Sequence, residues 1–312
     1  MISRNTVLVL GAGASKPYGF PIGLELVDQI CAEILDNANR TGLRSRLANR
    51  FSKNGDRAVE DFARALRQAR AYSIDRFLET RAGFQTIGKA AIADVLLRAE
   101  GSADTYPAPT VDWYRYLLDR IAQRDTAHFI AQAKRLSIIT FNFDRSFEQA
   151  LFSMLSARLG LTEREARHLA TCVDIHHVHG TLGAPAWLYP DQSTANPYGV
   201  TADKLEAAVA HAVDSIKNIH DDIDEITIED LQVPLGSADF VYFIGFGFDQ
   251  RNLERIGVPT IFKGMSVVRG TTLGLTEHEL RPAVRLFNHK PIHFHHVDAL
   301  TFMRSHAEAL FT

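Results

Sequence analysis

The chain has 312 residues, its 34 basic and 37 acidic side chains leave a net charge of -3, and its cysteines are Cys31 and Cys172 alone. A near-neutral balance supplies no global positive field, so we expect no direct binding of nucleic acid or of an anionic membrane. Two separated cysteines exclude a disulfide framework and a four-cysteine zinc site, and no apolar stretch reaches the roughly 20 residues that span a bilayer, so we predict a cytoplasmic protein.

The chain opens with a predicted β-α unit. Residues Thr6 to Leu10 form an apolar, β-branched run, and after a glycine turn a helix begins at Pro21. From about residue 36 to 135 the apolar residues keep a helical period and no strand is convincing. We therefore predict a large helical insertion after the first β-α unit.

The apolar positions of this insertion allow two interpretations. Residues such as Tyr114, Leu117 and Leu118 recur at helical spacing. They either mediate self-association or docking of a partner, or pack on the core of the same chain. Our expectation is self-association or docking.

Beyond the insertion, strands and helices alternate. Strands are predicted at Leu136 to Phe141, Val173 to His179, Asp239 to Gly245, Thr271 to Leu275 and Pro291 to His296. Helices are predicted at Asp144 to Leu159, Ala202 to Lys217, Gln250 to Ile256, Glu277 to Phe287 and Asp298 to Leu310. This order favours an α/β fold, a Rossmann-like doubly wound parallel sheet. We treat residues 1–312 as a single domain with a second, smaller insertion at about 185–235.

Four segments lie at the carboxyl ends of predicted strands, where a parallel α/β sheet places its ligand. They are Gly11-Ala12-Gly13-Ala14-Ser15, Thr140-Phe141-Asn142-Phe143-Asp144, His177-Val178-His179-Gly180 and Ile244-Gly245-Phe246-Gly247-Phe248-Asp249.

The glycine turn between strand and helix lets the backbone approach a pyrophosphate, and Ser15 adds a hydroxyl. A tight turn without a ligand is the alternative. A hydride-transfer enzyme fits poorly, because that fingerprint needs a third glycine where this chain has Lys16.

The next two segments carry side chains suited to catalysis. Asn142 can hydrogen-bond a ribose hydroxyl and hold a nucleophile below the anomeric carbon, and Asp144 can fix that loop, although a turn residue and a helix N-cap are the simpler interpretations. His179 can act as a base near neutral pH, although a buried structural histidine is the commoner case. His177 and His179 share a strand face, so a His-x-His metal site is a minor alternative, and we predict none.

Together the segments resemble the nucleotide pocket of the sirtuin superfamily. Residues 11 to 15 are similar to its Gly-Ala-Gly-x-Ser turn, residues 140 to 144 to its Thr-Gln-Asn-x-Asp motif, and His179-Gly180 to its catalytic His-Gly. Sirtuin deacylases also carry a zinc ribbon of two Cys-x-x-Cys pairs, which two isolated cysteines cannot build. The chain therefore most resembles the zinc-free, sirtuin-like NAD hydrolases of bacterial anti-phage defence, including their Ser73-Ile74-Asp75-x-Phe77-Leu78 segment.

The resemblance implies an NAD glycohydrolase without a metal, in which Asn142, His179 and Asp144 are catalytic. It also implies NAD contacts from Gly11, Ala12, Gly13, Ser15, Pro21, Thr140, Phe141, Gly245, Gly247, Phe248, Val297 and Asp298. The implied partners are a second copy of the chain, in a homo-oligomer, and a separate regulator such as a HerA-like ATPase or a short Argonaute. The alternatives are a non-catalytic module that binds NAD or ADP-ribose and, third, a protein deacylase or ADP-ribosyltransferase.

Overall fold

The structure is a computed structural model. It describes residues 2–35, 42–51, 54–102, 106–190, 192, 195–217, 225–258, 261–262, 266–287 and 291–310. Within this part of the chain, no helix is both long enough and apolar enough to cross a bilayer.

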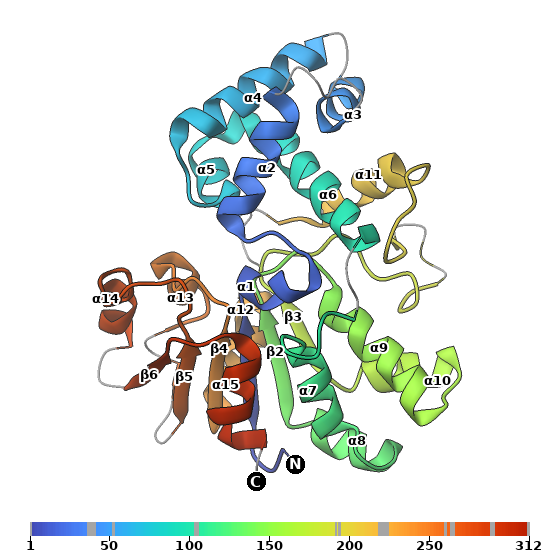
Figure 1. The fold of residues 1–312 in the computed structure, drawn as a ribbon, viewed down its shortest axis with the longest axis vertical. Coiled ribbons are helices and arrows are strands. Elements are labelled where there is room, and N and C mark those ends of the chain that lie inside the picture. The colour runs from blue at the N-terminus through green and yellow to red at the C-terminus, as the bar shows by residue number, and fades with distance from the viewer. Residues whose placement is uncertain are drawn as a thin grey trace.

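A six-stranded, all-parallel sheet forms the centre of the fold (Figure 1). Its strands are β1 (Thr6–Leu10), β2 (Leu136–Thr140), β3 (Asp174–His177), β4 (Phe240–Ile244), β5 (Val267–Thr271) and β6 (Ile292–His295). They lie in the order β3-β2-β1-β4-β5-β6, which is the strand order of a doubly wound Rossmann fold. The predicted fold class is confirmed.

The central strand β1 shows why the sheet is covered on both faces. All five of its residues are buried, as expected for a parallel strand between two helical layers. Because successive side chains point to opposite faces, Leu8 and Leu10 belong to one hydrophobic core and Val7 and Val9 to the other.

Helices α7 (Trp113–Ile121), α8 (Thr126–Ala133), α9 (Ser146–Leu159), α10 (Glu163–Ala170) and α15 (Ala299–Ser305) contribute to the first core. Helices α12 (Glu225–Ser237), α13 (Gln250–Arg255) and α14 (Glu277–Leu286) contribute to the second. The sheet is thus wound on both sides.

The predicted helical insertion is confirmed, because the described residues between β1 and β2 contain helices and no strand. The short α1 (Ala12–Ser15) precedes it, and a lobe stands beyond the carboxyl edge of the sheet (Figure 1). That lobe holds α2 (Gly23–Leu35), α3 (Leu43–Arg50), α4 (Gly55–Ala69), α5 (Ile74–Thr80) and α6 (Gln85–Ser102), and α11 (Leu205–Ser215) packs along α6.

The self-association expected of Tyr114, Leu117 and Leu118 is not supported. These residues lie on α7, which returns to the sheet, and all three are buried in the core of the same chain. Their apolar stripe is covered by intramolecular packing, so it offers no docking surface.

Three other details of the sequence interpretation need correction. The fifth strand is Val267–Thr271, earlier than the predicted Thr271 to Leu275. Helix α10 was not predicted, although Thr162 and Glu165 form a complete capping box at its start. Helix α12 was not predicted either, and Pro234 lies inside it.

Candidate functional site

The candidate site lies where the winding direction of the sheet reverses. Strands β2 and β4 flank β1 in register, so the residues Leu10, Thr140 and Ile244 end side by side. The chain leaves this edge as the turn at Gly11 and the loop at Gly245. In doubly wound folds such a switch point at the carboxyl ends is where ligands bind.

The glycine turn packs directly on the loop after β4. Gly11 N donates to Ile244 O at 3.0 Å and Gly13 N to Gly245 O at 3.0 Å. A Cβ on Gly245, whose φ is +57°, would lie 2.1 Å from Ala14 N. The glycines are therefore required by the close approach of two chain segments, and the N–H groups of Gly11 and Gly13 already have acceptors.

We expect Gly245→Ala to destabilise the fold by more than about 2 kcal/mol, because the new methyl group meets backbone and the left-handed φ strains it further. Gly247→Ala is the matched control. Gly247 is exposed, and a Cβ there meets no atom within 4 Å, so a change within about 0.5 kcal/mol is expected. Urea unfolding of both variants measures the difference, and equal effects would contradict the packing described here.

Asn142 is buried just beyond β2, and its amide orientation is fixed. Its Nδ2 donates to Gly11 O at 3.0 Å and to Ser15 Oγ at 2.9 Å. A carbonyl can only accept, so Nδ2 must face Gly11 and the amide oxygen must face away. Oδ1 takes part in none of the hydrogen bonds described for this part of the chain. The site therefore presents an amide oxygen that can accept a hydrogen bond from a hydroxyl or a water molecule.

Asp144 supports Asn142 indirectly, through its hydrogen bond with Ser15. Its carboxylate accepts from Ser146 N at 3.1 Å and from the Ser146 hydroxyl, and it also hydrogen-bonds the Ser15 side chain. The Tyr114 hydroxyl lies 2.8 Å from Ser146 Oγ. Burial raises the pKa of Asp144, while the hydrogen bonds from both serines oppose that shift. The geometry gives Asp144 a supporting role behind Asn142.

His177 and His179 point to different partners. His177 Nδ1 lies 3.0 Å from Asn142 O, and its Nε2 lies 2.6 Å from Glu148 Oε1 on α9. Burial lowers the pKa of His177, but the Glu148 carboxylate and the Asn142 carbonyl outweigh it and raise the pKa overall. His177 thus braces the backbone of Asn142. Strand β3 ends at this residue, so the predicted shared strand face with His179 is wrong.

His179 lies two residues beyond β3 and is buried. Arg255 Nη1, on α13, lies 3.2 Å from His179 Nδ1, and the Phe141 ring packs edge-on with its centroid 5.4 Å away. Burial, then the charge of Arg255, lowers the pKa of His179 to about 4, while a hydrogen bond with Asn252 raises it. The imidazole is therefore neutral at neutral pH.

This shift predicts acid sensitivity. The pKa of His179 is about 4 in the folded protein, against an ordinary value of 6.5. Between these two pH values the unfolded chain binds a proton at His179 and the folded protein does not. The contribution of His179 to the free energy of unfolding is complete above pH 6.5 and is lost as the pH falls toward the folded pKa. We expect wild-type protein to lose about 2 kcal/mol more than His179→Gln between about pH 7.5 and about pH 5, measured by urea unfolding. Parallel losses in both proteins would contradict this.

The loop after β4 forms the opposite wall of the site. Phe248 is buried with φ +52°, a strained conformation for a bulky residue, and its ring packs on Gly270, where a Cβ would lie 2.6 Å from Phe248 Cζ. Asp249 then caps α13 by accepting from Arg251 N at 3.0 Å and Asn252 N at 3.3 Å. The loop thereby orients α13 so that Asn252 and Arg255 contact His179.

The structure brings most of the predicted site residues together. Ala12 and Ser15 lie on α1, Thr140 Oγ1 accepts from Asn142 N at 3.1 Å, and Gly247 is exposed on the loop after β4. Phe248 is packed into the aromatic core, so its ring is not open to a ligand.

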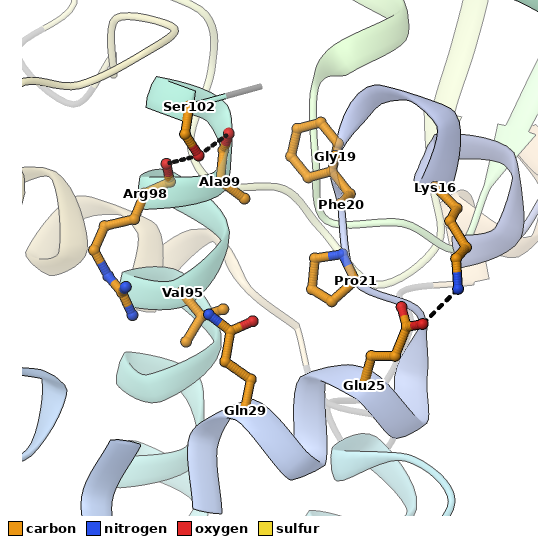
Figure 2. Close-up of a pocket in the computed structure, with 10 residues that line it drawn as sticks. All are labelled: Lys16, Gly19, Phe20, Pro21, Glu25, Gln29, Val95, Arg98, Ala99 and Ser102. Carbon is orange, nitrogen blue, oxygen red and sulfur yellow. Dashed lines mark hydrogen bonds and ion pairs between the residues drawn. The ribbon is translucent and has the colours of Figure 1, made fainter. Parts of the chain in front are cut away.

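No described contact joins Pro21, Val297 or Asp298 to this group. Pro21 lines a cavity of about 430 Å³ between the Gly19–Pro21 turn, α2 and α6, together with Val95 and Arg98 (Figure 2). Asp298, three residues after β6, caps α15 by accepting from Thr301 N at 2.9 Å. The contacts described for Asp298 support a structural cap.

Several site residues escaped the sequence analysis. Arg255 and Asn252 reach His179 from α13, and Tyr114 and Glu148 reach the Asn142 loop from α7 and α9. Their sequence context carries no motif, and only the fold brings them to the strand ends. Within the described residues, no three His, Cys, Asp or Glu side chains are placed to hold a metal ion.

No model of a known protein family matches the chain, and a comparison with curated proteins finds no match. Function therefore has to be inferred from the chemistry of the site itself.

Proposed function

We propose that the chain is an NAD glycohydrolase that cleaves NAD to nicotinamide and ADP-ribose. The observation that carries this proposal is the fixed amide of Asn142. Both of its N–H groups are engaged, by Gly11 O and Ser15 Oγ, and its oxygen faces away from them at the switch point of the sheet. An oriented acceptor can position a ribose hydroxyl or a water molecule below an anomeric carbon.

The chemistry requires little from the protein beyond positioning. The bond between ribose C1′ and the cationic nicotinamide nitrogen breaks, and its electron pair neutralises the leaving group. A water oxygen then bonds to C1′ and releases a proton. An oxocarbenium-like transition state of this kind is favoured by holding the sugar and the water in place, for which Asn142 and His179 are the candidate residues. No metal is needed for such a leaving group.

The neutral state of His179 supports a second candidate function. A histidine with a pKa of about 4, hydrogen-bonded to Arg255, is a weak base. This favours the alternative of a non-catalytic module that binds NAD or ADP-ribose.

Incubation with NAD separates the two functions. Purified protein, alone and with candidate partners such as a HerA-like ATPase or a short Argonaute, is mixed with NAD, and the products are resolved by chromatography. We expect nicotinamide and ADP-ribose in equal amounts. Intact NAD under every condition, with saturable NAD binding by calorimetry, would establish the binding module instead.

We further propose that activity depends on a homo-oligomer or on such a partner, acting as the NAD-depleting effector of an anti-phage system. The support is the resemblance of the Asn142 and His179 segments to those enzymes. Light scattering across a concentration series, combined with NAD turnover, tests this dependence. A monomer with full activity and no response to any partner would overturn it.

A further inference from the structure

His179 is held by residues from a distant part of the chain. Helix α13 supplies Arg255, with Nη1 at 3.2 Å from His179 Nδ1, and Asn252, whose side chain hydrogen-bonds the imidazole. The rings of Phe141 and Phe143 flank it, with centroids 5.4 Å and 6.2 Å away. Every described polar contact of the His179 side chain thus comes from α13.

A second layer links α13 to the helical lobe. Arg251 forms an ion pair with Glu79 on α5. Asp75 lies one turn before Glu79 on the same helix. Burial, with a smaller contribution from Glu79, raises the pKa of Asp75 to about 6, and the nearby positive charge of Arg255 partly opposes this rise. The Ser73–Leu78 segment noted in the sequence therefore reaches the site through Asp75.

The donor and acceptor rules fix the tautomer of His179. A guanidinium has five N–H donors and no acceptor, so His179 Nδ1 must be unprotonated where it meets Arg255. A neutral imidazole then carries its proton on Nε2. The hydrogen bond with the Asn252 side chain raises the pKa of His179, as expected when an imidazole N–H donates to an amide oxygen.

We infer that Arg255 is a positioning residue for His179, and that its guanidinium holds the imidazole in the neutral Nε2–H form. In this arrangement the single N–H of His179 donates to the Asn252 side chain, and it can donate to an oxygen of the ligand only in exchange for that bond. His179 can take a proton from water only after Arg255 has left Nδ1. The assignment of that ligand oxygen to the ribose of NAD rests on the proposed function, whereas the tautomer itself does not.

The test is the protonation of His179 by NMR on full-length protein labelled in its histidine rings, with His179→Gln to assign the signal. In the wild type, long-range nitrogen–proton spectra should show a protonated Nε2 and an unprotonated Nδ1. In Arg255→Leu, the pKa of His179 should rise by about 1 unit or more, because a neighbouring positive charge and a bond to the neutral ring are both removed.

Arg251→Leu is the matched control. Arg251 lies on the same helix and pairs with Glu79, but no described contact joins it to His179, so the pKa of His179 should stay unchanged. A wild-type ring protonated at Nδ1 would overturn the inference even if Arg255→Leu did not fold. An unchanged pKa in folded Arg255→Leu, or an equal rise in Arg251→Leu, would overturn it as well. If the protein did not hydrolyse NAD, the NMR results for His179 would still stand. The proposed NAD glycohydrolase activity and the proposed role of Arg255 can therefore fail separately.

Discussion

Asn142→Ala is expected to lower NAD turnover by at least ~100-fold, because positioning of the reacting groups typically contributes at least that much. The substitution removes the oriented oxygen that would hold the ribose or the attacking water. It also removes the donors to Gly11 O and Ser15 Oγ, so a loss of about 1–3 kcal/mol in stability is expected beside the catalytic effect. Initial rates well below the midpoint of thermal unfolding measure turnover on folded protein.

Asn5→Ala is the control for this experiment. Asn5 precedes β1 at the opposite, amino edge of the sheet, and its exposed amide donates to Ser237 O at 3.4 Å. Turnover should stay at the wild-type value. His177 is not a neutral control, because it contacts the Asn142 carbonyl and Glu148. Turnover above one tenth of wild type in folded Asn142→Ala would contradict the role proposed for Asn142.

The strands that carry the site could be predicted because their runs of apolar, β-branched residues are typical of a parallel strand that is buried on both faces. The buried, β-branched runs that end at Leu10 and Thr140 satisfy their backbone only inside a sheet. The fifth strand was misplaced because Arg269 and Gly270 interrupt its apolar pattern. The structure supplies the reason for the glycine, since the Phe248 ring occupies the space of its side chain.

The candidate site could be predicted only in part, for a related reason. Asn142 and His179 follow strands directly, so local order places them at the carboxyl edge. The groups that set their chemistry, Arg255 on α13 and Tyr114 on α7, come from distant segments and depend on tertiary packing. The same dependence changed the interpretation of Gly11 and Gly13, whose N–H groups donate to the last carbonyl of β4 and to the first carbonyl of the loop after it.

The buried ion pair between Arg145 and Glu100 joins α6 of the helical lobe to the Asn142 loop. Arg145 Nε lies 3.0 Å from Glu100 Oε1 and Nη2 lies 2.5 Å from Oε2, and both side chains are almost completely buried. Arg145 also donates to the carbonyls of Gly183, Asn196 and Pro197 at 2.7–3.2 Å. One guanidinium therefore fixes α6, the start of α9 and the loop residues Gly183, Asn196 and Pro197.

Glu100→Gln is expected to lower the free energy of unfolding by about 3–5 kcal/mol, because it keeps the size of the side chain but leaves the charge of Arg145 buried without a counter-charge. Asp119→Asn is the matched control. It breaks the exposed pair of Asp119 with Arg158, 2.7 Å apart, and should cost at most about 1 kcal/mol. Urea unfolding of the two variants measures the difference. If they lose equal stability, Arg145 is solvated rather than enclosed, and it cannot be what holds the helical lobe against the Asn142 loop.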